Sequence, residues 1–169
     1  QVIYPQKEGD WYVVTVETGA LNIIFRNGTD WTTNKNQTED ITVTSNINIQ
    51  LHQSGDNKAT YEVLERDLVV KAKMPSHWTN TITALVTPDG GETKEVTPEL
   101  KGGWYVFTQS CKQLTVVYRN GAASGDTNQS EPITLEENAM LQLTQEGTAK
   151  AVCNFVVADP AKHVFVVGD

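Results

Sequence analysis

Residues 102–121 read Gly-Gly-Trp-Tyr-Val-Phe-Thr-Gln-Ser-Cys-Lys-Gln-Leu-Thr-Val-Val-Tyr-Arg-Asn-Gly, and residues 9–28 read Gly-Asp-Trp-Tyr-Val-Val-Thr-Val-Glu-Thr-Gly-Ala-Leu-Asn-Ile-Ile-Phe-Arg-Asn-Gly. The two stretches align without a gap, and 9 of the 20 positions are identical. Each contains two short segments rich in Val, Ile, Thr and aromatic residues, followed by Asn-Gly. This pattern predicts two β-strands that end in a tight turn.

The match continues beyond this stretch and indicates a duplicated module. Residues 36–46 align with residues 128–138, and the similarity runs on to Gly55 and Gly147. A fixed offset of about 92–93 residues is the signature of an internal repeat. We therefore predict two domains, a first repeat over residues 1–66 and a second over residues 67–169.

The outer parts of the two repeats are less regular. The first copy has no counterpart of residues 68–92, so we expect its N-terminal part to be missing and the chain to come from a longer multimodular protein. Residues 159–169 are ambiguous. The segment 162–167 is either the last strand of the second repeat, the first strand of a following module, or a strand that crosses over to complete the first repeat.

Strand patterns recur along the whole chain at even spacing, with Gly-rich turns between them and no convincing amphipathic helix. This predicts an all-β fold, which we expect to be an antiparallel immunoglobulin-like β-sandwich in each repeat. Trp11 and Trp104 are expected in the core, with the following tyrosines on the opposite face, because side chains alternate along a strand. Asn27-Gly28 and Asn120-Gly121 are expected to form tight turns.

The composition narrows the class of partner. The net charge is −8 and no basic run occurs, which argues against nucleic acid and anionic membranes as partners. No apolar stretch approaches the length of a transmembrane helix, and no signal-peptide pattern opens the chain. We therefore expect a neutral partner and no cofactor.

Four short motifs in a fixed order carry a family resemblance. The second copy contains Met-Pro-Ser-His-Trp at 74–78, Gly-Trp-Tyr-Val-Phe at 103–107, Leu-Thr-Val-Val-Tyr-Arg-Asn-Gly at 114–121 and Asn-Gln-Ser-Glu-Pro-Ile at 128–133. The chain resembles the starch-binding carbohydrate-binding modules of family 26 and its relative family 25, which read P-x-x-W, G-W-Y, I-I-F-N-N-G and Q-T-x-D-I. The first copy matches the later motifs, and the resemblance covers most of 68–138 and about 9–45.

This resemblance implies a non-catalytic β-sandwich that binds starch, amylopectin and maltooligosaccharides. Such a module would be monomeric and secreted or attached to a bacterial cell surface, as an accessory part of an amylase or starch-adherence protein. The resemblance places a stacking Trp at Trp78 and a hydrogen-bonding Gln at Gln129, whose counterpart is Gln37. We add His77 as a neighbouring candidate. The families carry exposed tyrosines where residues 81–86 read Thr-Ile-Thr-Ala-Leu-Val, so we expect weak binding by the second copy.

Each candidate residue also has a structural alternative. A glucose ring offers apolar C–H faces and an edge of hydroxyls, so a site needs exposed aromatic planes and amide or hydroxyl partners. Trp78 is either such a plane or a cap on the sandwich edge. Gln129 and Gln37 bind either sugar hydroxyls or the backbone of their own turns. Trp31, in a Thr- and Asn-rich loop of the first copy only, is either a second plane or a residue folded over its own sandwich.

Catalytic chemistry has little support in the sequence. A glycosidase needs two carboxylates that flank a cleft. Glu39 and Glu131 are the only acids shared by both copies at a loop position, one in each copy. The histidines occur singly, without metal-ligand spacing, at His52, His77 and His163. We therefore expect neither an enzyme nor a metal site.

The two cysteines, Cys111 and Cys153, lie in the second copy only. A disulfide between them would suit an extracellular module, whereas two buried thiols fit the sequence equally well. The sequence leaves their pairing open.

Two functions of different classes compete for this sequence, and a protein-binding surface module is a third, more distant option. In the first, the chain binds α-glucan and the indole rings of Trp78 and Trp31 are exposed. In the second, it is an immunoglobulin-like spacer or adhesin module without sugar binding, and loops cover both indoles. The exposure of these two side chains therefore separates the two hypotheses.

Overall fold

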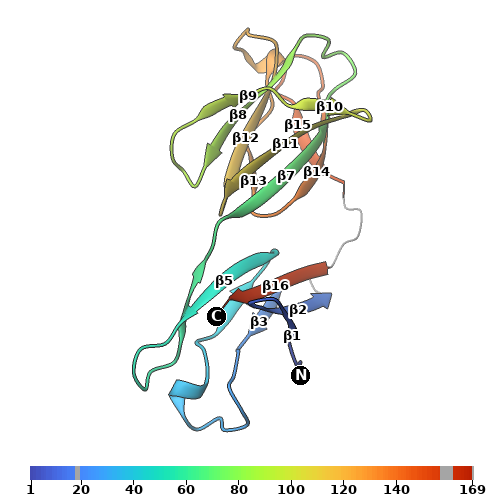
Figure 1. The fold of residues 1–169 in the computed structure, drawn as a ribbon. Helices are drawn as coiled ribbons and strands as arrows, with labels where there is room; N and C mark the ends of the chain where they lie inside the picture. Colours follow the sequence, from blue (N-terminus) through green and yellow to red (C-terminus); the bar gives the residue numbers. More distant parts are fainter. Residues whose placement is uncertain (18–19, 157–161, 169) are drawn as a thin grey trace. The chain divides into compact units, whose positions relative to one another are not determined.

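The computed structural model describes residues 1–17, 20–156 and 162–168, and nearly all of their regular structure is β-strand. The predicted all-β fold is confirmed. The described helices are two 3₁₀ turns, η1 (Asn34–Asn36) and η2 (Asp126–Asn128), neither of which could cross a membrane. The chain forms two compact units (Figure 1), unit 1 from Gln1–Glu65 with Asp159–Asp169 and unit 2 from Arg66–Ala158.

Unit 2 contains two β-sheets, with strand orders β10-β11-β7-β14-β15 and β13-β12-β8-β9. The strands are β7 (Arg66–Lys73), β8 (Ile82–Pro88), β9 (Lys94–Val96), β10 (Glu99–Lys101), β11 (Trp104–Cys111), β12 (Leu114–Asn120), β13 (Ile133–Leu135), β14 (Ala139–Thr144) and β15 (Val152–Phe155). β7 and β14 pair in parallel, whereas the other paired strands of this unit are antiparallel. The predicted antiparallel arrangement therefore does not extend to this pair.

The core of unit 2 follows from strand alternation. In β12, Leu114, Val116 and Tyr118 are buried and their neighbours Thr115 and Val117 are half-buried. β7, β8 and β14 show the same period of two. Because one cluster of buried side chains joins both sheets, they are held together mainly by apolar burial, which contributes about 1.5–3 kcal/mol for each large side chain.

On β11 it is Tyr105, and not Trp104 as predicted, whose side chain faces the core. Tyr105 packs against the core cluster, as does Phe107 two residues later, so alternation directs Trp104 to the other face of the sheet. There the ammonium of Lys73 lies 4.6 Å from the centre of the Trp104 ring. The burial of Phe107 and Cys111 sets this register, which the Trp-Tyr motif alone does not specify.

Unit 1 contains a five-stranded sheet, in the order β1-β2-β16-β5-β6, and a two-stranded sheet of β3 and β4. The strands are β1 (Gln6–Glu8), β2 (Trp11–Glu17), β3 (Leu21–Ile23), β4 (Ile41–Val43), β5 (Ile47–His52), β6 (Thr60–Val63) and β16 (Lys162–Gly168). Among its described side chains, Val14, Ile41, Val43 and Ile49 form the buried cluster. Trp11 is half-buried and lies outside this cluster.

The strand β16 lies in unit 1 and not with the second repeat. It pairs antiparallel with β2 and parallel with β5, so of the three possibilities for residues 162–167 the structure has the crossing strand (Figure 1). The predicted division into 1–66 and 67–169 therefore needs correction at its second boundary. The reason is physical: a strand is placed by its pairing partners, which sequence order does not reveal.

Equivalent loops in the two units have equivalent backbone contacts. The amide of Thr38 donates to the Phe25 carbonyl at 3.0 Å, and the amide of Ser130 donates to the Tyr118 carbonyl at 2.9 Å. The left-handed backbone expected at Asn-Gly is present at Gly28 and Gly121, which have φ of 85° and 81°, but not at Asn27 and Asn120.

The two cysteines are separate thiols in this structure. Cys111 is buried and Cys153 is half-buried, and both pack within the core of unit 2. Burial raises the pKa of the Cys153 thiol. The disulfide alternative is therefore not the state that the structure describes.

Candidate functional site

Trp78 is a core residue, with only 6% of its surface exposed. The turn that carries it is closed by a hydrogen bond from the Trp78 amide to the Pro75 carbonyl at 3.0 Å. Its indole Nε1 donates to Oε1 of Gln145 at 2.7 Å. The expectation of an exposed indole is wrong here, because Gln145 supplies the polar partner that lets a Trp in a polar turn be buried.

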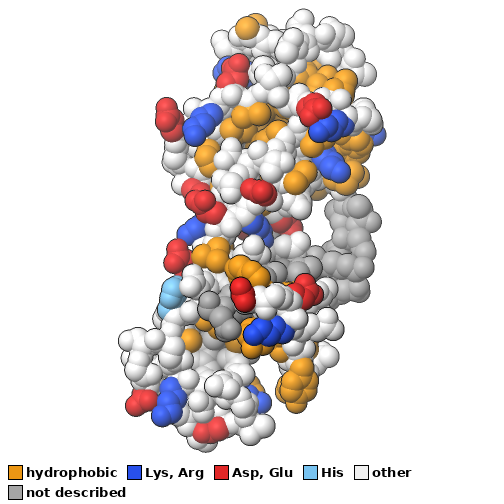
Figure 2. Space-filling model, viewed as in Figure 1, with side chains coloured by type: hydrophobic (Ala, Val, Ile, Leu, Met, Phe, Trp, Pro, Cys, Tyr) orange, Lys and Arg blue, Asp and Glu red, His pale blue; other side chains and the backbone are white. Residues whose placement is uncertain are grey.

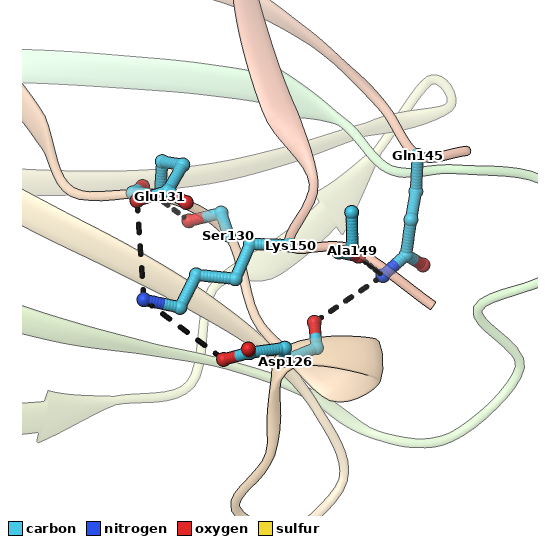
Figure 3. A network of polar contacts seen from close by, with 6 residues as sticks. All are labelled: Asp126, Ser130, Glu131, Gln145, Ala149 and Lys150. Carbon is cyan, nitrogen blue, oxygen red and sulfur yellow. Dashed lines mark hydrogen bonds and ion pairs between the residues drawn. The ribbon is translucent and has the colours of Figure 1, made fainter. Parts of the chain in front are cut away.

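Gln145 connects three segments of unit 2. Its Oε1 also lies 2.8 Å from Nε2 of the exposed His77, and its Nε2 donates to the carbonyls of Ala149 at 2.6 Å and Thr127 at 3.1 Å. Figure 3 shows the Gln145 amide directed toward Ala149 and Asp126. The sequence analysis missed this residue, although Gln53, its counterpart at the 92-residue offset, donates likewise to the carbonyl of Asn57, the counterpart of Ala149.

The two candidate glutamines lie at equivalent places. The carbonyls of Gln129 and Gln37 accept hydrogen bonds at 2.9 Å from the amides of Ala151 and Ala59, respectively. Both side chains are half-buried, and Nε2 of Gln37 donates to the carbonyl of Trp31 at 3.4 Å. This last contact corresponds to the alternative in which the amide satisfies the backbone of its own turn.

Trp31 is the candidate whose indole is exposed, with 55% of its surface accessible. The guanidinium carbon of Arg26 lies 3.8 Å from the centre of its ring, which is a close cation–π contact. Arg26 also donates to the carbonyl of Thr29 at 3.3 Å. Because Arg26 covers one face of the indole, the exposed area comes from the other face and the edge.

The loop around Trp31 is fixed by the carboxylate of Asp30. Its Oδ1 accepts hydrogen bonds from the hydroxyl of Thr32 at 2.6 Å and the amide of Thr32 at 2.8 Å, and its Oδ2 accepts from the hydroxyl of Thr33 at 2.6 Å. These bonds, led by that of the Thr32 hydroxyl, lower the pKa of Asp30 to about 2. The amide of Asn27 donates to the Asn36 carbonyl at 2.8 Å and closes the loop at its base.

Unit 2 has an open groove of about 530 Å³ beside the equivalent loop, with polar side chains and the small residues Gly121, Ala122 and Ala123 in its lining. Residues of β8, β9 and β12 line it together with the loop that follows β12. The lining includes Asn80, Thr81, Thr83, Glu95, Arg119 and Asn128. Nε of Arg119 is buried and has no hydrogen-bond partner among the described residues. Arg119 is the counterpart of Arg26, so the shared Arg-Asn-Gly marks equivalent places in the two units.

Glu131, an acid that both copies share at a loop position, forms an ion pair in unit 2. Glu131 pairs with Lys150 at 3.9 Å, and the same ammonium lies 4.0 Å from Asp126 (Figure 3). Within residues 1–17, 20–156 and 162–168, no group of three or more His, Cys, Asp or Glu side chains could hold a metal ion. The side chain of His163 lies outside the described part of the structure.

The structure therefore separates the predicted site residues into two groups. Trp31 and Gln37 meet in one loop of unit 1, whereas Trp78 and His77 share the partner Gln145 in unit 2. Gln129 adjoins Asn128, which lines the groove of unit 2.

On the face drawn in Figure 2, acidic and basic side chains are interspersed. No family model, curated protein or solved structure matches this chain.

Proposed function

We propose that this chain is a non-catalytic carbohydrate-binding protein that holds a neutral polysaccharide, with α-glucan such as starch as the favoured ligand. The observation that carries the proposal is the exposed indole of Trp31, supported from behind by Arg26. The family resemblance supports the same ligand class. In this proposal the two units are copies of one immunoglobulin-like module of an extracellular bacterial protein.

The Trp31 loop has the properties that stacking on a sugar requires. An indole plane matches the apolar C–H face of a pyranose, and Asp30 holds the loop before ligand arrives. A preordered loop loses less conformational entropy on binding. The loop 29–36 also contains Thr and Asn residues, whose side chains are of the type that binds sugar hydroxyls.

The groove of unit 2 would be a second, weaker site. Its amides, hydroxyls and the Arg119 guanidinium suit the hydroxyl edge of a sugar. Its lining contains no aromatic plane. Two weak sites on one chain would raise avidity for a polymer if both engage at once.

Native electrophoresis through gels with and without soluble starch tests the proposal. We expect starch to retard the wild type, Trp31→Ala to restore most of the mobility, and Glu95→Ala to have a smaller effect. Tyr4→Ala is the matched control, because Tyr4 is an 86% exposed aromatic of unit 1 outside the loop. If starch leaves the wild-type mobility unchanged, the α-glucan proposal fails.

One observation favours a second candidate function. The burial of Trp78 is what an immunoglobulin-like spacer or adhesin module without sugar binding would have at this position. In that case Trp31 would be a surface residue without a ligand. Unchanged migration of both the wild type and Trp31→Ala would favour this alternative.

A further inference from the structure

The strand β16 occupies a slot between two strands of unit 1. Residues Lys162–Gly168 pair antiparallel with Glu17–Trp11 of β2, and residues Phe165–Gly168 pair in parallel with Ile47–Gln50 of β5. Figure 1 shows β2, β16 and β5 side by side. Without a strand in the slot, β2 and β5 would each expose a row of unpaired backbone N–H and C=O groups.

Unit 2 has the same slot, filled by β7 between β11 and β14. Even the register agrees: Val70 lies opposite Ala139, and Phe165 lies opposite Ile47, the counterpart of Ala139 at the 92-residue offset. The slot is therefore a feature of the module, and β16 and β7 are equivalent occupants.

The two occupants differ in how the chain supplies them. β7 leads directly into β8 of its own unit, and β8 pairs with β12 over seven residue pairs. β16 instead follows β15, which pairs with β14 in unit 2. Thus β16 is joined to unit 1 by strand pairing alone, while the covalent chain joins it to the other unit.

We propose that the slot between β2 and β5 is a strand acceptor that also takes β16 from a second copy of this chain, so that copies assemble by exchanging this strand. Every backbone pairing would be the same in the exchanged state as within one chain. The balance between the two states is then set by chain entropy and protein concentration, as in domain swapping. The occupant is a second copy because β16 is the strand whose register with both sides of the slot is known.

Disulfide trapping between two single-cysteine variants tests the exchange. Thr15 and Val164 are register partners, and the Cα atoms of antiparallel partners lie within the range that a disulfide spans. Thr15→Cys and Val164→Cys chains would be mixed at high concentration, unfolded and refolded together, and then oxidised. We expect a disulfide-linked dimer that contains one chain of each kind.

Controls separate this product from other dimers. Each variant alone and the wild type report any link through the native thiols Cys111 and Cys153. In the dilute range, the trapped fraction of the mixture should rise about tenfold for a tenfold higher concentration. The double variant Thr15→Cys/Val164→Cys should form a link within one chain when diluted.

Two outcomes would overturn the proposal. One is a double variant that links only within its own chain at every concentration, while the mixture gives no mixed dimer. The other is a double variant that never forms the disulfide, because β16 would then not occupy the slot. Neither outcome depends on starch binding, so failure here is distinct from failure of the proposed function.

Discussion

The two units bury equivalent residues to different extents. Leu114, Val116 and Tyr118 of β12 are fully buried, whereas their counterparts Leu21, Ile23 and Phe25 are half-buried. The difference lies in the neighbouring strand. β12 is paired on both sides, by β13 and β8, whereas β3 pairs with β4 alone among the described strands.

This comparison identifies the strands that cover the buried cluster in each unit. The slot strand is present in both units, as β7 and as β16, but the hairpin of β8 and β9 in unit 2 has no counterpart among the described residues of unit 1. Because β8 contributes the buried residues Ile82, Ala84 and Val86, its absence leaves one side of the equivalent cluster less covered. Unit 1 should therefore depend more heavily on its slot strand.

The largest effect is expected from breaking that strand. Val166 is paired on both sides, with Val13 and Asn48, so Val166→Pro removes a backbone donor from the middle of the sheet and should cost on the order of 3 kcal/mol or more. We expect amide hydrogen exchange to accelerate throughout β2 and β5. The strands β11 and β14 serve as the internal control, since their slot strand is intact. Unchanged protection of β2 and β5 would contradict the dependence of unit 1 on β16.

A matched pair of core truncations compares the two clusters directly. Leu141 and Ile49 are counterparts at the 92-residue offset, with exposures of 0% and 1%. Leu141→Ala and Ile49→Ala should each cost about 2–5 kcal/mol, with the larger loss in unit 2. The reason is that the half-buried neighbours of Ile49 can relax into the space or admit water. Urea unfolding followed by hydrogen exchange in each unit measures the costs, and equal losses would mean that the two clusters are equally rigid.

A smaller effect is expected at the glutamine that both units share. Gln145→Ala leaves the buried indole N–H of Trp78 without its acceptor, which should cost about 1–3 kcal/mol. Gln53→Ala is the matched control, because the contacts of Gln53 are with the carbonyls of its own loop. We expect Trp fluorescence to report a more exposed indole in Gln145→Ala only. Equal losses of stability in both variants would show that the loop contacts, and not Trp78, determine the role of this residue.

The sequence predicts those parts of the molecule that local pattern determines. The strands of unit 2 and the positive φ of Gly28 and Gly121 follow from alternation and turn chemistry within a few residues. The position of β16 and the parallel pairs do not, because pairing partners are chosen across the whole chain. The face on which Trp104 lies also depends on non-local packing. The position of the second sheet determines which alternate set of β11 side chains is buried.

The same division holds for the candidate site. The Thr- and Asn-rich composition around Trp31 is a local feature, and it agrees with the exposure of the Trp31 side chain in the structure. The burial of Trp78 depends on Gln145, which lies 67 residues further along the chain. The residues close in sequence to the Pro-Ser-His-Trp turn do not include that acceptor. An indole in a polar turn therefore cannot be taken as exposed until the partner of its N–H is known.

The smallest effect is expected at the position where the units differ by one hydroxyl. The buried hydroxyl of Tyr118 has no hydrogen-bond partner among the described residues, and its counterpart in unit 1 is Phe25. Tyr118→Phe removes an unpaired buried polar group with little change of shape, so it should stabilise unit 2 by about 1 kcal/mol or be neutral. Denaturant unfolding at neutral pH measures this difference, and a clear loss would reveal a partner for the hydroxyl.

The pH dependence of the same variant gives a sharper test. Burial, with a smaller contribution from the charge of Cys153, raises the pKa of Tyr118 above its ordinary value of 10.0. A phenol whose pKa is raised by folding stabilises the protein fully below its unfolded pKa, and this stability is lost as the pH rises above about 10. The wild type should therefore lose more stability than Tyr118→Phe between pH 9 and 11. Parallel losses in the two proteins would mean that other groups control alkaline unfolding, and the buried hydroxyl would then have no part in the difference between the units.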